Sequence, residues 1–338
     1  MIIIRVDIIG GSLAGLSTAI TIKEKSKSID VTVHEKHKKI GYNHEGRRCG
    51  EAHTISEEWE KWKPDKSSIY NMIKKIEISI GKRKYEFFYE PWHTCILNRQ
   101  EYIYQLGIKA NKLGANIQTN DKIKSVNDLD GDIIVDASGC PSCIKRELGI
   151  DKGPKGVTYQ QTLENSNFFN KDLMRVFYSG TIGYYWIFPR NPEKKEINLG
   201  LGFFGTKKLD FNLKEKLDEF KKELGITGKI NYTLGGLVPN GLQKPFLHKN
   251  ILFVGDAGVG TFPLTGEGIY RALLSGETAG RCIIKNTVKK YPYYIKRLFI
   301  KWNTVGNIFT RINYILREIN PDLVLKSNNL FIRLYPPK

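Results

Sequence analysis

The sequence has 338 residues, which is long enough to bury a large core and to form two domains. Its 53 Lys and Arg residues outnumber its 35 Asp and Glu residues, and the net charge of +18 attracts polyanions such as nucleic acid, anionic lipid headgroups or phosphorylated substrates. Five cysteines do not indicate a disulfide framework, and no run approaches the roughly 18 apolar residues of a membrane-spanning helix. Because "MIIIRVDIIGG" leads into a strand and not a signal peptide, we expect a cytoplasmic protein.

Residues 6–25, "VDIIGGSLAGLSTAITIKEK", predict a strand, a glycine-rich turn and a helix. The pattern Gly10-x-Ser12-x-x-Gly15 is one glycine short of the dinucleotide-binding fingerprint. Gly10 suits the tight turn, small Ser12 allows the backbone to approach a pyrophosphate, and Gly15 allows close packing of the helix on the strand. The pyrophosphate is expected at the helix N-terminus, where free N–H groups favour anions.

A second strand is predicted within "IDVTVHEK", residues 29–36, and it ends at Glu35. A carboxylate at this distance from the glycine turn can accept hydrogen bonds from both hydroxyls of an adenosine ribose. The order of strand, turn, helix, strand and terminal acid therefore predicts a Rossmann-type half-site.

A third segment, "ILFVGDAGVGTFPLTGEGI" at residues 251–269, runs from an apolar strand through two glycine turns into a helix. We expect Asp256 to accept a hydrogen bond from a ribityl hydroxyl of FAD, and backbone N–H groups from Gly266 to Ile269 to face the flavin ring. The alternative is that Asp256 caps the helix that follows. Arg99 at the head of a predicted amphipathic helix, a strand within 114–126, and a strand ending at 137–139 also fit a flavoprotein.

The middle of the chain predicts a second, sheet-rich domain inserted into the nucleotide-binding domain. Residues 69–95 read as a hairpin around Gly81-Lys82-Arg83, and residues 155–240 contain several further strands. Tyr184, Trp186 and Phe188 stand two apart in "YYWIFP", so on a strand they share one face. Three aromatic rings on one face either fill a core or line an apolar pocket, and the pattern alone favours a core.

Two further motifs have the spacing of functional sites but lack the sequence context that those sites need. "GLGFFG" at 200–205 has the spacing of a nucleotide loop, but "TKKLDFN" follows where a helix should begin, so a second nucleotide site is not expected. "CPSC" at 140–143 could be a redox dithiol, but that chemistry needs a complete NADPH domain, and a zinc site needs a second cysteine pair. We expect incidental cysteines at a helix start, and no metal.

Through Gly10–Gly15, Glu35, Arg99, 132–139 and Gly255–Asp256, the chain resembles FAD-dependent oxidoreductases of the p-hydroxybenzoate hydroxylase type. Within that group "RRCGEA" at 47–52 and "YYWIFP" at 184–189 resemble the archaeal geranylgeranyl reductases, which saturate isoprenoid chains of membrane lipids. The resemblance is clear to about residue 285. It implies an α/β fold with a Rossmann-type FAD-binding domain, an inserted antiparallel-sheet substrate domain and a C-terminal helical segment.

The resemblance also implies site residues. Cofactor binding is expected of Gly10, Ser12, Leu13, Ala14, Gly15, Glu35, Lys36, Arg48, Cys49, Gly50, Arg99, Ile123, Asp256, Gly266, Gly268 and Ile269. The isoprenoid chain is expected along Tyr184, Trp186, Phe188 and Pro189, which reverses the inference of a closed core. Cys49, after two arginines in the loop that passes the flavin in this fold, is the expected catalytic residue beside the ring or the substrate.

The domain boundaries follow from these assignments. Residues 1–68, 96–150 and 245–285 are expected to form the FAD-binding domain, 69–95 and 151–244 the substrate domain, and 286–338 the helical segment. The tail from "KKYPYYIKRLF" mixes apolar and basic residues at helical intervals, so it either packs on the protein or lies on an anionic membrane.

The sequence is compatible with three functions. The first is reduction of polyprenyl C=C bonds, with a hydride from reduced FAD and a proton from Cys49 or an ordered water. Its electron donor would be external: ferredoxin, NAD(P)H or another reductant. The second is hydroxylation or halogenation with O₂, because tryptophan halogenases carry a Trp-x-Trp-x-Ile-Pro string similar to "YYWIFP". The third is a non-enzymatic basic protein that binds lipid or nucleic acid, although no known nucleic-acid module is visible.

Overall fold

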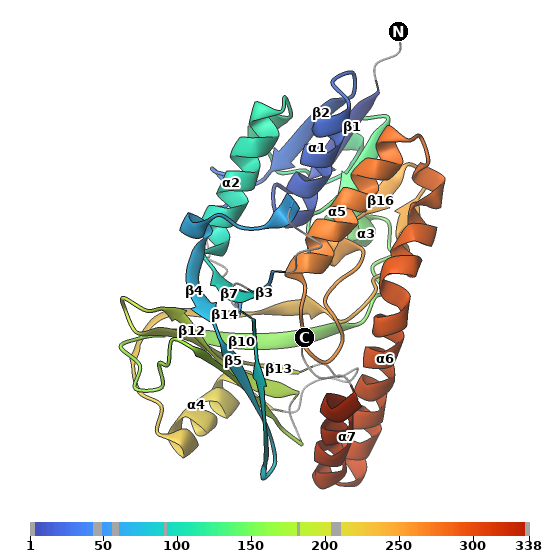
Figure 1. Ribbon diagram of the computed structural model, residues 1–338. Coiled ribbons are helices and arrows are strands. Elements are labelled where there is room, and N and C mark those ends of the chain that lie inside the picture. Colours follow the sequence, from blue (N-terminus) through green and yellow to red (C-terminus); the bar gives the residue numbers. More distant parts are fainter. Residues whose placement is uncertain are drawn as a thin grey trace. The chain divides into compact units, whose positions relative to one another are not determined.

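The computed structural model describes residues 4–42, 49–55, 61–90, 93–180, 183–203 and 211–334. The chain forms two compact units (Figure 1). Unit 1 comprises residues 1–46, 100–154 and 238–305, and unit 2 comprises residues 47–99, 155–237 and 306–338. The boundaries expected from the sequence stay a prediction; the units differ from them in dividing the tail at residue 305 and in including residues 47–68 in unit 2.

Unit 1 is built on a six-stranded sheet. Its order is β15 (Leu247–His248), β16 (Ile251–Phe253), β9 (Ile133–Asp136), β1 (Arg5–Ile9), β2 (Asp30–Glu35) and β8 (Asn116–Thr119). All neighbours pair in parallel except β15 and β16. The carboxyl ends of the parallel strands therefore meet at one edge, which is where open α/β sheets bind their ligands. The chain leaves β1, β2, β9 and β16 at this edge.

The helices of unit 1 are α1 (Leu13–Lys25), α2 (Arg99–Lys112), α3 (Cys143–Glu147) and α5 (Ile269–Ile284), with short 3₁₀ turns η3 (Val126–Asp128), η4 (Gly255–Ala257) and η5 (Val288–Lys290). Helices α1 and α5 pack against each other through small residues. A Cβ on Gly280 would lie 2.9 Å from the Cβ of Thr21, and one on Gly276 would overlap Ser17 and Ala14. This close approach fixes the start of α1 beside the start of α5.

Unit 2 contains two sheets. The larger has the order β14 (Lys229–Pro239), β10 (Lys155–Glu164), β13 (Glu196–Phe203), β12 (Tyr184–Asn191), β11 (Leu173–Tyr178), β5 (Lys75–Ile80) and β6 (Arg83–Phe88). The smaller has the order β3 (Ala52–Thr54), β7 (Thr94–Leu97) and β4 (Ile69–Ile73), and η2 (Lys66–Ser68) precedes β4.

The strand pairing refines the expected antiparallel sheet. The predicted hairpin forms from β5 and β6 around Gly81 and Lys82, while β4 and β7 at either end of residues 69–95 belong to the smaller sheet. Strands β5 and β11 pair in parallel, which is possible because they come from separate chain segments that no tight hairpin turn joins.

Helix α4 (Leu213–Leu224) covers one face of the larger sheet. Asn212 caps its N-terminus, and Gly225 ends it in a left-handed conformation. Leu217 and Phe220 pack into a core with Ile187 and other strand residues, and the rings of Tyr185 and Phe220 stack at 4.1 Å. Because side chains alternate along β12, residues 184, 186 and 188 lie on the opposite face.

The predicted helical tail forms α6 (Tyr291–Ile319) and α7 (Pro321–Leu334). Within unit 2 the two helices pack through Phe309 and Phe331, whose ring centroids are 5.1 Å apart, and through a hydrogen bond of 2.6 Å from Asn313 to Asn328. In the part of the chain that the structure describes, no helix combines the length and apolar character needed to cross a bilayer.

Candidate functional site

The turn after β1 is shaped by glycines. Gly10 has a φ of +103°, and a Cβ on it would lie 2.6 Å from the carbonyl oxygen of Ala137. A Cβ on Gly15 would overlap the carbonyl oxygen of Gly10. Ser12 is the N-cap of α1, and among the described residues its side chain caps none of the N–H groups of the first turn. Those donors suit the pyrophosphate expected there.

Glu35 is buried at the end of β2 and is held in place by three donors. Its Oε2 accepts a hydrogen bond of 2.8 Å from the N–H of Gly11, and its Oε1 accepts bonds from the N–H of His37 at 2.9 Å and from Nδ1 of His37 at 2.5 Å. The two carboxylate oxygens offer about four acceptor sites and three are occupied, so a ribose hydroxyl can still donate to Oε2. The carboxylate is therefore fixed against the glycine turn in advance, with His37 as a partner that the sequence did not reveal.

Asp256 lies on η4, beside the start of α1. Gly255 has a φ of +55°, and a Cβ on it would lie 2.8 Å from the Cβ of Ala14. The N–H of Gly255 donates to Oγ of Ser275 at 2.9 Å. Asp256 does not cap the next long helix, because α5 begins at Ile269 with Gly268 as its N-cap. The structure thus places Asp256 and the glycine turn together within unit 1.

The loop after Asp256 is held by Arg271. This buried guanidinium donates to the carbonyls of Val259 at 2.7 Å and Gly260 at 2.9 Å, and it lies 4.6 Å from the ring of Phe299. Burial lowers the pKa of Arg271 to about 10, so it still carries a charge at neutral pH. The same region shows one difference from expectation: the N–H of Gly266 donates to the carbonyl of Phe262 at 2.9 Å.

In unit 2, the aromatic residues of β12 form a continuous row. The ring centroids of Tyr184 and Trp186 are 5.8 Å apart, and those of Trp186 and Phe188 are 6.5 Å apart. Tyr184 and Trp186 are buried and Phe188 is partly exposed. Gly200 faces Trp186 from β13, and a Cβ on Gly200 would overlap the indole. This glycine of "GLGFFG" therefore makes room for an aromatic ring within a strand.

The segment Cys49–Gly50 lies against this aromatic face. A Cβ on Gly50 would lie 2.9 Å from the ring of Phe188. The carbonyl of Cys49 accepts hydrogen bonds from Nε2 of Gln160 at 3.3 Å and from Nδ2 of Asn198 at 3.2 Å. Oε1 of Gln160 in turn accepts from Nε1 of Trp186 at 3.1 Å. The two predicted substrate-side features, Cys49 and the aromatic row, are thus joined by hydrogen bonds.

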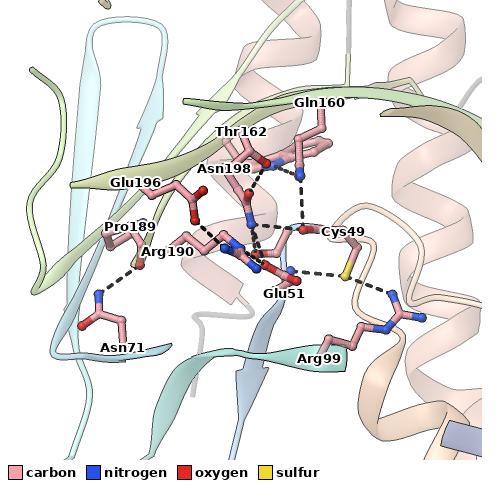
Figure 2. Close-up of polar contacts among 12 residues, drawn as sticks. Cys49, Glu51, Asn71, Arg99, Gln160, Thr162, Pro189, Arg190, Glu196 and Asn198 are labelled. Carbon is pink, nitrogen blue, oxygen red and sulfur yellow. Dashed lines mark hydrogen bonds and ion pairs between the residues drawn. The ribbon is translucent and has the colours of Figure 1, made fainter. Parts of the chain in front are cut away.

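The sulfur of Cys49 accepts two hydrogen bonds. Nη1 of Arg99, which begins α2 but belongs to unit 2, donates to it at 3.3 Å, and the N–H of Glu51 donates at 3.2 Å (Figure 2). Both donors stabilise negative charge on sulfur. Arg48, expected beside Cys49, lies outside the described residues.

A buried ion-pair network holds Glu51, which follows Cys49 by two residues. Arg190 donates from Nε to Oε2 of Glu51 at 2.6 Å and also pairs with Glu196, and Asn198 donates to Oε2 of Glu51 at 3.1 Å. Burial acts to lower the pKa of Arg190, but Glu51 and Glu196 hold it above its ordinary value. Glu51 has a φ of +63°, unusual for a residue other than glycine, so the network holds the backbone next to Cys49 in a special conformation.

Comparison with known proteins connects this sheet to a family. The sequence profile described as "Geranylgeranyl reductase catalytic domain" matches residues 155–237. The digeranylgeranylglycerophospholipid reductase of Methanocaldococcus jannaschii is 28% identical over 323 residues, covering 83% of this chain and 78% of the relative. That of Methanococcus aeolicus is 28% identical over 321 residues, covering 80% and 73%. The chain is therefore similar to geranylgeranyl reductases over most of its length. This confirms the resemblance seen in the sequence.

Solved structures show the same fold beyond the geranylgeranyl reductase family. A geranylgeranyl bacteriochlorophyll reductase-like protein from Thermoplasma acidophilum is similar with a TM-score of 0.80 at 22% identity, covering 95% of this chain and 89% of that one. A flavin-dependent halogenase is similar with a TM-score of 0.70 at 16% identity, covering 97% and 68%. The α/β fold expected from the sequence is confirmed, but these identities are too low to assign an activity.

The remaining expected site residues lie on helix α1, directly after β2, in a core cluster of unit 1 and on β12. Leu13 and Ala14 are buried in the first turn of α1, and Lys36 is exposed directly after Glu35. Ile123 packs against a core cluster of unit 1 that includes Ile9 and Phe253, so its side chain has a structural partner. The carbonyl of Pro189 accepts a hydrogen bond of 3.0 Å from Asn71. Whether these residues touch a cofactor or substrate stays a prediction.

The two weaker motifs lie partly or wholly in the described part of the chain. Gly200 and Gly202 lie inside β13, not at a strand-to-helix turn. Cys143 begins α3, both cysteines of "CPSC" are free thiols, and the described residues contain no group of three or more side chains that could hold a metal ion.

Proposed function

We propose that this protein is an FAD-dependent reductase that saturates C=C bonds of geranylgeranyl or other polyprenyl chains in archaeal-type lipids or prenyl diphosphates. One observation carries the proposal. The catalytic-domain profile of geranylgeranyl reductases falls on residues 155–237, and these strands present the aromatic row against which Cys49 and Gly50 pack. The named relatives in two methanogens support lipid-linked geranylgeranyl chains as the substrate class.

Unit 1 fits FAD. A Cβ on Gly10 or Gly15 would strike a carbonyl oxygen of the chain itself, so the turn is tight; among the described residues Ser12 leaves the first N–H groups of α1 without a side-chain cap, and Glu35 stands fixed beside the turn. We assign the pyrophosphate to the first turn of α1, the adenosine ribose to Glu35 and the ribityl chain to Asp256. When bound and reduced, FAD supplies a hydride for one carbon of the alkene. The side chains of the protein are assigned the binding of the substrate and the supply of the proton.

Unit 2 is assigned the isoprenoid chain. Such a chain offers few polar handles, so its binding depends on shape and on burial of apolar surface, at about 25 cal/mol per Å². Tyr184, Trp186 and Phe188 supply a row of rings for this purpose. The proposed tunnel along these rings aligns one double bond and excludes water.

Saturation also needs a proton, and Cys49 is the proposed donor. Its sulfur already accepts hydrogen bonds from Arg99 and from the N–H of Glu51. These donors stabilise the sulfur once its proton has left, and Gln160 and Asn198 hold the backbone of Cys49 in place. This arrangement holds the thiol in a fixed position.

The electron donor is proposed to be external: reduced ferredoxin, NAD(P)H or another reductant. We also propose a cytoplasmic protein that works at the surface of the membrane, where its substrate resides. The basic charge of +18 supports contact with anionic lipid.

The test is anaerobic incubation of the flavin-loaded protein with dithionite and a geranylgeranylated glycerophospholipid. Mass spectrometry should show a gain of two hydrogens for each bond reduced. An unchanged lipid mass, with the flavin confirmed as bound and reduced, would overturn the proposal.

The O₂-dependent alternative keeps one observation in its favour, which is the shared fold with a flavin-dependent halogenase. Rapid O₂ consumption with a stoichiometric hydroxylated or halogenated product would establish that alternative. A colourless protein that cannot be reconstituted with FAD would instead favour a non-enzymatic binding protein.

A further inference from the structure

A cavity of about 420 Å³ lies in unit 2 between α7 and the turn of the β5–β6 hairpin, and no residue of the aromatic row lines it. The hairpin contributes Ile80, Gly81, Lys82 and Arg83, and α7 contributes five residues between Leu325 and Arg333. This volume is within the range of ligand-binding pockets.

The cavity walls are fixed by direct contacts. Gly81 has a φ of +59°, and a Cβ on it would lie 3.3 Å from Cδ1 of Leu325, so the turn sits close against the helix. The hydroxyl of Tyr85 on β6 donates to Oδ1 of Asn329 on α7 at 2.7 Å. Asn329 also donates from Nδ2 to the carbonyl of Leu325 at 2.8 Å. The cavity is therefore built by two elements that are bonded to each other.

The rim of the cavity is cationic. Lys82, Arg83, Lys326 and Arg333 are all exposed, and none of the four forms an ion pair within the described residues. None of the described residues that line the cavity is acidic. Four unneutralised cations around an apolar floor of Ile80, Leu325 and Leu330 match a molecule with an anionic head and an apolar body.

The same helix pair exposes a second apolar feature. Ile308, Ile312, Ile315 and Ile319 follow one another at intervals of four, three and four residues, so they share one face of α6, and they are 40% to 68% exposed. Leu330 and Leu334 of α7 are 52% and 57% exposed. A helix pair that carries both exposed aliphatic side chains and cations such as Lys326 and Arg333 is typical of segments that bind at a membrane interface.

We propose that the cavity between α7 and the β5–β6 turn binds the phosphate headgroup of an anionic lipid and docks the protein on the membrane. The four cations contact the phosphate, and the first carbons of the lipid chains rest on the apolar floor. The proposal rests on the proposed function only in that a reductase of membrane lipids must reach a membrane; the docking site itself is separate from the reducing site.

The test compares the full-length protein with a quadruple variant, Lys82→Ala, Arg83→Ala, Lys326→Ala and Arg333→Ala. Binding is measured by co-sedimentation with vesicles of phosphatidylcholine alone and of an equal mixture of phosphatidylcholine and phosphatidylglycerol. We expect the wild-type protein to bind the anionic vesicles and the variant to bind them about fivefold more weakly for each cation removed.

A matched control separates a specific site from overall charge. The variant Lys27→Ala, Lys112→Ala, Lys122→Ala and Lys152→Ala removes four exposed lysines from unit 1, so its net charge falls equally. It should keep most of the binding. Equal losses in both variants would overturn the site, because they would show attraction by net charge alone.

Three further results would also overturn the proposal: equal binding to both kinds of vesicle, binding of inorganic phosphate without binding to vesicles, or loss of a concentration-dependent dimer as the sole effect of the quadruple variant. Reduction of detergent-dispersed lipid should be the same for wild type and variant. If neither protein reduced that lipid but vesicle binding behaved as expected, the proposed function would fail and the docking site would stand.

Discussion

The backbone of Gly50 lies against the ring of Phe188, so closely that a Cβ on Gly50 would come within 2.9 Å of the ring. Residues 138 positions apart in the chain are thereby packed together, and Cys49, next to Gly50, is placed on the aromatic face of β12. A methyl group at position 50 has no room unless the ring moves.

Gly50→Ala should therefore reduce the free energy of unfolding by about 1–3 kcal/mol, the usual cost of overpacking. Phe188→Leu in the same chain should relieve part of this cost, because the smaller side chain leaves room for the methyl group. Urea unfolding of both single variants and the double variant measures the coupling. Strictly additive effects would show that the two residues are not in contact.

Arg190 should be essential for stability, because it neutralises two buried carboxylates. Arg190→Met leaves Glu51 and Glu196 buried without their partner and should cost about 3–5 kcal/mol of unfolding free energy. Lys74→Ala is the matched control: Lys74 pairs with Asp172 at 3.1 Å, but its side chain is 72% exposed, so its loss should cost less than about 1 kcal/mol. A similar cost for both variants in urea unfolding would contradict the assigned network.

The flavin assignment predicts a loss of cofactor without loss of fold. Glu35→Ala and Asp256→Ala should each weaken FAD binding by about tenfold or more, as expected when a hydrogen bond to a charged group is removed. Asp30→Ala is the control, since Asp30 is exposed at the opposite end of β2. The flavin-to-protein ratio after reconstitution gives the result, and circular dichroism checks the fold. Full occupancy in both site variants would refute the assignment.

The sequence predicted the nucleotide-binding unit well, because its signals are local. A strand, Gly10, Gly15 and a helix lie within 25 residues, and the carboxylate of Glu35 ends the next strand. The role of Asp256 toward the ribityl chain stays a prediction, and the contact of Gly255 with Ala14 that fixes its place joins distant segments. His37 was missed as a partner of Glu35, because nothing in "HEKH" indicates which way its ring turns.

The site of unit 2 was predicted only in part. Cys49 and the aromatic row came from the family resemblance, since alternation of rings on a strand is equally typical of a core. The network of Glu51, Arg190 and Glu196 was missed because Glu51 and Arg190 are 139 residues apart and no periodicity connects them. A usable signal was present: Arg190 and Glu196 are charged residues at the ends of strongly apolar strands, and such residues need partners when buried.

His53 should make stability depend on pH. It is buried on β3, and burial lowers its pKa from 6.5 to about 4. The unfolded chain therefore takes up the proton first as the pH falls, and stability drops between about pH 6.5 and pH 4 by at most about 3 kcal/mol. Above this window His53 contributes no pH dependence.

The measurement is urea unfolding of wild type and His53→Gln at pH 7 and pH 5. The wild type should lose about 2 kcal/mol more than the variant over this interval. Parallel losses in the two proteins would mean that His53 is not held in its neutral form by the fold.

Substitution of Trp186 should affect binding of the lipid substrate without affecting binding of the flavin. Its indole is the centre of the aromatic row, and its Nε1 donates to Gln160, which also bonds the carbonyl of Cys49. Trp186→Ala removes both the apolar ring and this hydrogen bond, whereas Trp186→Phe keeps an aromatic ring but loses the hydrogen bond. If apolar contact with the isoprenoid chain is the ring's main contribution, the two variants should differ in lipid reduction.

We expect Trp186→Ala to lower kcat/KM for lipid reduction by about 10- to 100-fold, which corresponds to the burial of one large apolar side chain. Trp186→Phe should retain most of the activity. Both variants should keep the flavin absorbance spectrum, because Trp186 lies in the sheet of unit 2 and the flavin is assigned to unit 1. Equal loss of activity in both variants would assign the effect to the hydrogen bond that positions Cys49, and the row of rings would then lose its role as the binding surface for the isoprenoid chain.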